Sequence, residues 1–592
     1  MAKYLLFGVI LFAFISCADD KPKATIKQNL LTELSKLESD VQQFRHQADS
    51  QAGKAQLLEN FKVCRLQYKK TEWAVEYFLP ETARGINGPA LDEIEIEENK
   101  FFPPNGFQVI EELLTSEESD KKQMLQEIDV LLSNIRQSIS HFTAITLSDD
   151  YVMDALRMEV YRVITLGITG FDSPILNYSI VEARRSLIGI PGLIVLLENA
   201  QIDQSLLKIL TDSVQKASDY CVANDDFNSF NRAVFIKSYL NPISSTLAEI
   251  QEKSSIPNPK RTRPVSAAVQ TLFETGAFDP NAFVLSEEYQ LTPEKIALGQ
   301  QLFSDRNLSK NNDRSCVSCH IPEKAFTDGL KSNKSLRGHS LPRNTPTLTY
   351  ASLQNAQFWD MRQSDLERQS NDVIINKDEM HGSMDAILTS VKSNADYSSR
   401  FKKAFPKTAS IESWQIQNAI ASYVRSLNAF NSRFDDYMRN ENSLLSNEEI
   451  RGMNLFMGKA KCATCHFAPL FNGTVPPHYA KTEHEVVGTP ADANGKKLSS
   501  DLGRYAFNKM PQLLGAFKTP TLRNAALTAP YMHNGVYTSL EEVIDFYNKG
   551  GGIGLGLSVE RQTLPSDKLD LADSEKKALA AFIGTLTDKG YR

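Results

Sequence analysis

The chain has 592 residues, which is too long for a single hydrophobic core and indicates three or four domains. Its content of 41% hydrophobic and 23% charged residues is that of ordinary globular domains. The net charge of −7, without a long basic run, argues against a nucleic-acid partner.

The first residues have the pattern of a targeting segment. Lys3 provides a short positive region, and the apolar run from Leu5 to Ile15 is too short to span a bilayer. Cys17 follows the small Ser16 and precedes a polar stretch. Residues 1–17 therefore resemble a bacterial lipoprotein signal, with a lipid anchor on Cys17; an ordinary cleaved signal and an uncleaved anchor are the alternatives. We expect a periplasmic or cell-envelope protein, attached to a membrane by its lipid.

Residues 27–252 show apolar residues at spacings of three and four, which predicts a bundle of helices. Residues 253–266 are basic and rich in Pro and Ser, and we expect an exposed linker there. Beyond it, helical stretches alternate with long loops rich in Gly, Pro and Asn. Loops of that length in a compact domain usually serve a site. Few stretches favour strands, so the predicted fold class is mainly α.

Two Cys-x-x-Cys-His motifs carry the chemistry: Cys316, Cys319 and His320, then Cys462, Cys465 and His466. One such motif is expected by chance roughly 0.001 times in a chain of this composition. Two thiols three residues apart can form thioethers with the haem vinyl groups, and the adjacent His can ligate the iron. Zinc does not require a His directly after each Cys pair, and a redox dithiol calls for a βαβ context. We therefore predict two covalent c-type haems.

Both motifs follow a Gly and a Leu-Phe pair, which suggests an old duplication. We expect one haem domain at 267–440 and a second at 441–592. Taken together, the segments "SCVSCHIPEKAFTDG", "FWDMRQSDLERQ", "NKDEMHG" and "FKTPTLRNAALTAPYMHNGVYTSLEEVIDFYNKGG" resemble bacterial di-haem cytochrome c peroxidases and their MauG relatives. The resemblance runs from about residue 280 to 590. It implies two cytochrome-c-like domains, with a peroxidatic haem on His320 and an electron-transfer haem on His466.

The resemblance also implies a set of catalytic residues. Glu379 matches the acid–base that moves a proton between the two peroxide oxygens, and Gln369 matches its hydrogen-bonding neighbour. Trp359 matches the aromatic residue between the haems, although a Trp is also an ordinary core residue. The three residues follow one another at spacings of ten. Alone, Glu379 would be an ordinary solvated loop carboxylate.

The distal iron ligands follow from the same resemblance. His339 lies near the place of a His that blocks the first iron in resting peroxidases; it is otherwise a surface His beside an open site. Tyr547 stands where the usual peroxidase has a Met on the second iron and where MauG enzymes have Tyr. Met532 and Met510 are the alternative ligands of the second iron, the rivals of Tyr547. A phenolate ligand would favour ferric iron.

The family commonly holds a calcium ion between the haem domains, and the matching positions are Asn344, Thr528 and Pro530. Arg523 and His533 match residues that contact haem propionates, with ordinary loop packing as the alternative. Two positions depart from the family. Val373 replaces a Pro beside the first haem, and Ala460 replaces the Trp with which MauG exchanges electrons with its protein substrate.

Residues 27–252 resemble imelysin-like helical domains of exported proteins. Their Gly-x-His-x-x-Glu motif appears here as Gly106, Gln108 and Glu111. Because Gln is a poorer metal ligand than His, we expect a binding or docking module rather than a metal site.

Three functional hypotheses remain. The first is a peroxidase that reduces hydrogen peroxide with electrons from a small cytochrome c or cupredoxin, passed from the second haem to the first. The second is a MauG-like enzyme that oxidises Trp or Tyr of a partner protein. The third is a plain electron-transfer protein, which would not need Glu379 with Gln369. The family further suggests a homodimer.

Overall fold

The computed structural model describes residues 25–50, 52–95, 100–117, 120–261, 263–441 and 444–591. The predicted signal at 1–17, with Cys17, lies outside these residues. Within them, no helix is both long enough and apolar enough to cross a membrane.

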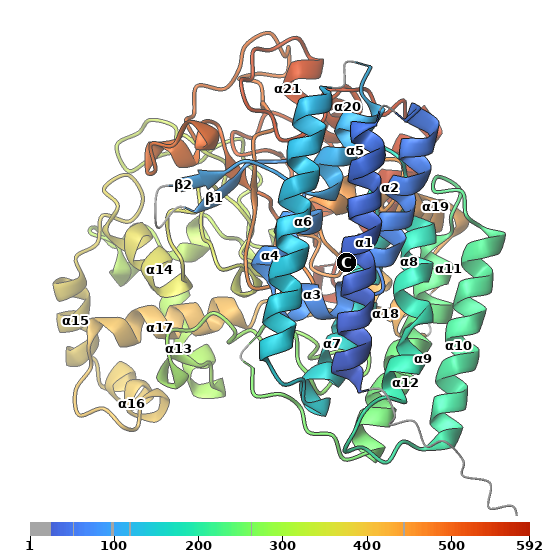
Figure 1. Cartoon of the computed structure of the whole chain (residues 1–592). Coiled ribbons are helices and arrows are strands. Elements are labelled where there is room, and N and C mark those ends of the chain that lie inside the picture. Colours follow the sequence, from blue (N-terminus) through green and yellow to red (C-terminus); the bar gives the residue numbers. More distant parts are fainter. Residues whose placement is uncertain are drawn as a thin grey trace, which may run out of the picture.

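The described chain is mainly helical, as predicted (Figure 1). The N-terminal part holds α1 (Ile26–Asp49), α2 (Lys54–Tyr68), α3 (Glu72–Phe78), α4 (Pro80–Asn87), β1 (Glu93–Glu95), β2 (Lys100–Phe102), α5 (Phe107–Thr115), α6 (Lys121–Ala144), α7 (Asp149–Arg162), α8 (Ser179–Ile188), α9 (Ile190–Ile194), α10 (Gln204–Ala223), α11 (Arg232–Phe235) and α12 (Asn241–Lys253). Single π-helical turns follow α7 at Val163–Gly167 and α11 at Ile236–Leu240.

The remainder of the chain combines helices with long loops. Its elements are α13 (Pro293–Ser304), α14 (Leu366–Ile375), α15 (Met384–Ser393), α16 (Ala395–Ala404), α17 (Ser413–Arg425), α18 (Arg433–Met438), α19 (Asn447–Phe456), β3 (His484–Glu485), β4 (Phe517–Lys518), α20 (Leu540–Asn548), α21 (Gly551–Gly554) and α22 (Asp573–Thr585). The strands form two small antiparallel pairs, β1 with β2 and β3 with β4.

The long N-terminal helices follow from their sequence pattern. In α1 a capping box between Thr25 and Gln28 satisfies free backbone N–H groups at the start. Leu30, Leu34 and Leu37 recur at spacings of three and four and are all buried, so one face of α1 packs on α6. Figure 1 shows these two helices side by side.

The buried hydrophobic residues form two large clusters of unequal size. One cluster runs from Ile26 in α1 through the N-terminal helices and continues into α18, at the end of the expected first haem domain, and into α19 and α22 of the second. A separate cluster holds α13 and α17, which lie on the opposite side of the molecule in Figure 1. The N-terminal domain and the second haem domain therefore share one core, which also takes in Tyr350 and α18, and the part of the first haem domain around α13 and α17 has its own core.

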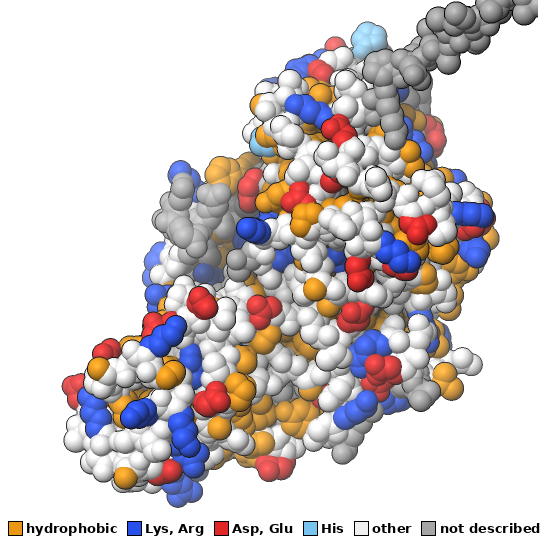
Figure 2. Space-filling model, turned by 90° about the horizontal axis from the view of Figure 1, so that it is seen from below, with side chains coloured by type: hydrophobic (Ala, Val, Ile, Leu, Met, Phe, Trp, Pro, Cys, Tyr) orange, Lys and Arg blue, Asp and Glu red, His pale blue; other side chains and the backbone are white. Residues whose placement is uncertain are grey.

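The segment expected to be an exposed linker is exposed in its middle and anchored at intervals. Lys260 and Arg261 are exposed, whereas Ile256 and Val265 are buried and the Arg263 guanidinium pairs with Asp154 of α7, its Nη2 lying 2.6 Å from Asp154 Oδ1. Its role as a linker between domains stays a prediction. On the face seen in Figure 2, acidic and basic side chains are mixed, in keeping with the small net charge.

Candidate functional site: two histidine-bearing loops on one cavity

Both Cys-x-x-Cys-His motifs fold in the same way. Single 3₁₀ turns at Cys316–Ser318 and Cys462–Thr464 place the two thiols of each motif on one turn. The backbone N–H of the following His closes the turn by donating to the first Cys carbonyl, at 2.9 Å in both copies. None of the four cysteines is in a disulfide.

The two histidines are held in the tautomer that iron requires. His320 Nδ1 lies 2.9 Å from the Phe326 carbonyl oxygen, and His466 Nδ1 lies 3.1 Å from that of Pro520. A carbonyl only accepts, so each Nδ1 carries the proton and each Nε2 keeps its lone pair. Burial lowers the pKa of both imidazoles, that of His466 to about 4, which also favours the neutral ligand form.

One continuous cavity of about 2470 Å³ is lined by both motifs. Gln369, Glu379, Trp359 and Tyr547 line the same cavity. The residues present therefore fit two haems: paired thiols, a free imidazole nitrogen beside each pair, and a large shared space.

A repeated segment supports both histidines. Residues 344–348 read Asn-Thr-Pro-Thr-Leu, and residues 518–522 read Lys-Thr-Pro-Thr-Leu. The Pro346 carbonyl contacts the His320 ring as the Pro520 carbonyl contacts that of His466. Each copy of this segment thus orients one histidine.

Trp359 joins the two copies of this segment. Its indole Nε1–H donates to the Asn344 carbonyl at 2.9 Å, and its own carbonyl accepts from the Lys518 backbone N–H at 2.8 Å. The predicted position of Trp359 between the two haem sites agrees with these contacts.

Helix α14 and the turn after it bring the predicted acid–base residues to the cavity. Asp365 caps the helix by accepting from Arg368 N at 2.8 Å. Gln369 and Val373, four residues apart, lie on its cavity side, and the turn at 376–379 adds Glu379.

The Glu379 carboxyl is buried and only partly satisfied, since its Oε2 has no hydrogen-bond partner among the described residues. Burial raises the pKa of Glu379, and the Arg362 guanidinium opposes that rise. Arg362 is held by Asp360 at 3.0 Å and stacks on the Phe358 ring. A raised pKa makes the carboxyl a stronger base once it is ionised, which suits a group that accepts and returns a proton.

Tyr547 lies at the second motif, as expected. Burial is the largest cause of the raised pKa of its phenol, and the nearby Cys465 and Cys462 raise that pKa further. Of its two rivals, Met532 lines the cavity, whereas Met510 packs in a small separate cluster with Val486 and is not part of the wall. The position of Met510 argues against it as a ligand; Tyr547 as iron ligand stays a prediction.

His339 sits at the rim of the cavity. Its side chain is 55% exposed; Nδ1 lies 3.1 Å from Ser335 Oγ, and Nε2 lies 3.6 Å from Asp378 Oδ1. In this arrangement it has the contacts of a surface His. Its role as a ligand of the first iron stays a prediction.

The three positions matched to calcium line the same cavity. The Asn344 amide nitrogen donates to the Leu330 carbonyl at 2.9 Å, which leaves its side-chain oxygen free to accept. The structure thus places Asn344, Thr528 and Pro530 at the cavity without testing the ion, which stays a prediction.

Arg523 has a different role from the one suggested by the sequence. It is fully buried, pairs with both oxygens of Asp435 at 2.9 and 2.8 Å, and donates through Nε to the Pro469 carbonyl. It is not among the residues that line the cavity, and this buried ion pair holds its guanidinium in the protein core, which favours ordinary packing over a propionate contact. His533 does line the cavity, stacked 3.8 Å from the Phe517 ring.

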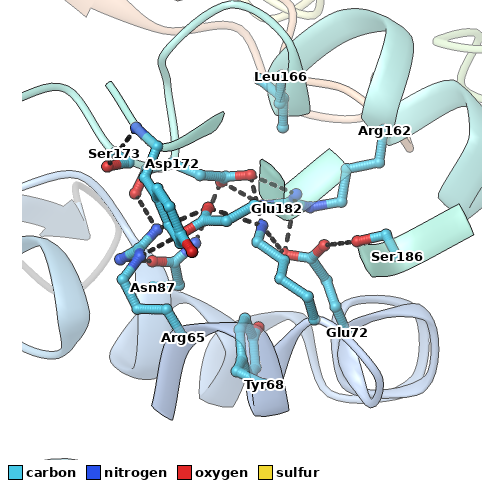
Figure 3. Close-up of polar contacts among 12 residues, drawn as sticks. Arg65, Tyr68, Glu72, Asn87, Arg162, Leu166, Asp172, Ser173, Glu182 and Ser186 are labelled. Atoms are coloured by element: carbon cyan, nitrogen blue, oxygen red, sulfur yellow. Dashed lines mark hydrogen bonds and ion pairs between the residues drawn. The ribbon is translucent and has the colours of Figure 1, made fainter. Parts of the chain in front are cut away.

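The N-terminal domain contains a buried ionic network (Figure 3). Arg65 pairs with Glu182, and Asp172 accepts from Lys69 at 2.7 Å and from Arg162 at 2.7 Å. Burial alone would raise the pKa of Asp172, but these two cations outweigh it and hold the carboxyl far below its usual range. Such networks fix geometry more than they add stability.

The Gly106, Gln108 and Glu111 motif of this domain makes its contacts within the domain itself. Gly106 adopts a positive φ of 92°, and a Cβ there would lie 2.4 Å from the Ile86 carbonyl. Gln108 donates to the Asn87 carbonyl at 3.0 Å, and Glu111 accepts from Ser173 Oγ at 2.9 Å. The expected binding or docking role is untested by these contacts and stays a prediction.

The N-terminal domain packs against the second motif. The π-helical turn at Val163–Gly167 contacts the Cys462–Thr464 turn, and Lys461 Nζ donates to the Pro174 carbonyl at 3.1 Å. Ala463 is 1% exposed and Thr464 is half-buried, whereas the equivalent Val317 and Ser318 of the first motif are half-buried and exposed. Ala460 is buried and lines the cavity.

Sequence reasoning missed Arg362 and Lys518. The signal for Lys518 was available, because the repeated Thr-Pro-Thr-Leu is visible in the printed sequence with Asn before one copy and Lys before the other. Arg362 left no such signal, since only the folded chain brings it to Glu379.

Two histidine-bearing loops that open onto one cavity, with a carboxyl and an amide facing them, define a protein that holds two haems. The sequence pattern of the family described as "Di-haem cytochrome c peroxidase" matches residues 293–443. The cytochrome-c peroxidase IdrP1 of Pseudomonas sp. (strain SCT) is 36% identical over 317 residues, which are 50% of this chain and 81% of that protein. The methylamine utilization protein MauG of Methylorubrum extorquens is 35% identical over 298 residues, 50% of this chain and 79% of MauG.

Among solved structures, a MauG-like protein associated with microbial copper homeostasis is similar to 52% of this chain and 92% of its own, with 33% identity and a TM-score of 0.46. Through its C-terminal half, the chain belongs to the family of di-haem cytochrome c peroxidases and MauG. It is an oxidoreductase of the peroxidase type.

Proposed function

We propose that the protein reduces hydrogen peroxide to two water molecules, using two protons and two electrons that a small redox protein delivers singly. His466 would hold the haem that receives the electrons and His320 the haem at which peroxide is reduced. Each Cys pair would bind its haem through two thioether bonds, and the two haems would supply the redox chemistry. A lipid anchor on Cys17 would keep the enzyme at the cell envelope, and a calcium ion would join the haem domains at Asn344.

The chain's own residues move the proton. Glu379, ionised, takes the proton from one peroxide oxygen and returns it to the other, which leaves as water. Gln369 lies on the same wall and can hold the peroxide by a hydrogen bond. Among the observations, the half-satisfied Glu379 carboxyl beside the first haem site carries the most weight, because an electron carrier needs no such group.

Glu379→Gln tests the proposal. Gln keeps the volume but cannot take the proton, so peroxide turnover should fall by about 10²–10⁴-fold while both haems stay bound. The measurement is steady-state turnover with a soluble reductant, together with haem absorbance. Glu323→Gln is the matched control, since Glu323 is an exposed carboxylate of the first motif loop. Full turnover in Glu379→Gln would remove Glu379 from the mechanism.

The second candidate, oxidation of Trp or Tyr in a partner protein, draws support from Tyr547 at the second motif. Ala460, which stands where MauG has Trp, disfavours the same electron route to a partner, because alanine has no aromatic ring. Spectra of the resting protein distinguish the candidates: a high-spin first haem with a Tyr-ligated second haem belongs to the MauG-like route.

A further inference from the structure

The two Thr-Pro-Thr-Leu segments differ in charge at equivalent positions. Asn344 begins the first and Lys518 the second, and both are bonded to Trp359 through their backbones. Each segment supports the histidine of one haem. The two haem sites therefore differ at equivalent positions: one has the neutral Asn344 side chain where the other has the Lys518 cation.

The Lys518 ammonium has only neutral hydrogen-bond partners in the part of the chain that the structure describes. Its Nζ donates to Gln354 Oε1 at 3.0 Å and to the Ala356 carbonyl at 3.1 Å. An ammonium has three N–H donors, so one donor and the whole positive charge are left over. Asp360, the carboxylate that raises the pKa of Lys518, is already paired with Arg343 and Arg362.

Lys518 is a half-buried residue of β4 in the cavity wall. The Lys518 backbone pairs with that of His484 in β3. Glu485, the next residue of β3, lies against Cys465 of the second motif. Lys518 itself lines the cavity. Burial lowers its pKa to about 8, so the ammonium still prevails at neutral pH. The carboxylate side chains of a haem are anions of the kind that the remaining donor takes.

A buried cation acts on a nearby redox centre by Coulomb's law. Ferric haem carries one more positive charge than ferrous haem, so a cation disfavours the ferric form and raises the reduction potential. The effect is large where solvent screening is weak. We propose that Lys518 raises the reduction potential of the haem held by His466, and that this charge makes the two repeated sites electrically unequal. The inference rests on the family's two haems and not on peroxide turnover.

Lys518→Met in the full-length haem-loaded protein tests the proposal, since Met keeps the length and removes the charge. An optical redox titration should give two midpoint potentials. One should fall by about 59 mV, a tenfold change in the ratio of ferric to ferrous haem for a one-electron couple. The other should move less, because the charge belongs to one site.

Lys518→Arg keeps the charge and should keep both potentials near those of the unaltered protein. Lys509→Met removes an exposed lysine of the same domain, and screening should leave both potentials unchanged. If Lys518→Met does not fold, Lys518→Gln supplies the neutral variant while retaining a donor for Gln354.

Unchanged potentials in the neutral variants would overturn the proposal. Equal shifts of both potentials would also overturn it, because the charge would then not belong to one haem site. The same shift in Lys518→Arg as in Lys518→Met would overturn it as well, because packing rather than charge would then be responsible. Peroxide turnover does not enter these measurements, so failure here leaves the proposed function standing.

Discussion

At the scale of single residues, Arg362 governs the proton affinity of Glu379. Burial raises the pKa of Glu379 and the Arg362 guanidinium lowers it, so Arg362→Gln should raise it further. The carboxyl would then stay protonated to higher pH and could not act as the base. We expect the acidic limb of the kcat/KM profile to move to higher pH, as measured by peroxide turnover across pH.

Arg368→Gln is the control for this variant. Arg368 is an exposed arginine on α14 that pairs with Asp365 at 3.0 Å, and it does not line the cavity. Its removal should leave the acidic limb in place. An unmoved limb in Arg362→Gln would show that the guanidinium does not act on the base.

At the scale of elements, two pairs of helices cross at a glycine. A Cβ on Gly299 of α13 would lie 1.9 Å from the Ala419 carbonyl in α17, and one on Gly452 of α19 would lie 1.9 Å from the Ala578 carbonyl in α22. Gly452→Ala should therefore push the helices apart and lower the free energy of unfolding by about 2–3 kcal/mol, as measured by denaturant titration.

Gly584→Ala serves as the comparison, because a Cβ there meets nothing within 4 Å and the residue lies in α22. Alanine favours the helix by up to about 1 kcal/mol over glycine, so this variant should be slightly more stable. Equal effects of the two substitutions would contradict close helix contact as the reason for Gly452.

At the scale of the whole molecule, Asn454 ties the N-terminal domain to the second haem domain. Its Oδ1 accepts from the Ala233 N–H at 3.1 Å, and its Nδ2 donates to Asn231 Oδ1 at 3.1 Å. Asn454→Ala leaves a part-buried N–H unpaired, at a cost of about 1–3 kcal/mol. Hydrogen exchange should become faster in α11 and in residues 462–466, and stay unchanged in residues 316–320.

The control is Gln417→Ala, which removes a hydrogen bond of 3.1 Å to Asn371 within the first haem domain. Its effect on exchange should stay within that domain, because Gln417 lies in α17, which belongs to the separate core with α13. Slower or unchanged exchange in α11 of Asn454→Ala would mean that the two domains are not coupled through this contact.

The sequence by itself determined the local chemistry. The Cys-x-x-Cys-His spacing specifies a haem-binding turn, and the pattern of Leu30, Leu34 and Leu37 specifies an amphipathic helix, because both depend on residues a few positions apart. Trp359, Gln369 and Glu379 were assigned from a resemblance, and all three line the cavity.

Only the tertiary structure decided which distant groups meet. It anchored the expected linker through Ile256, Val265 and Arg263, drew Arg523 into an ion pair with Asp435, and set Arg362 beside Glu379. It also packed the N-terminal domain against the second motif. Burial and charge pairing depend on contacts between residues far apart in the chain, and no local pattern encodes them.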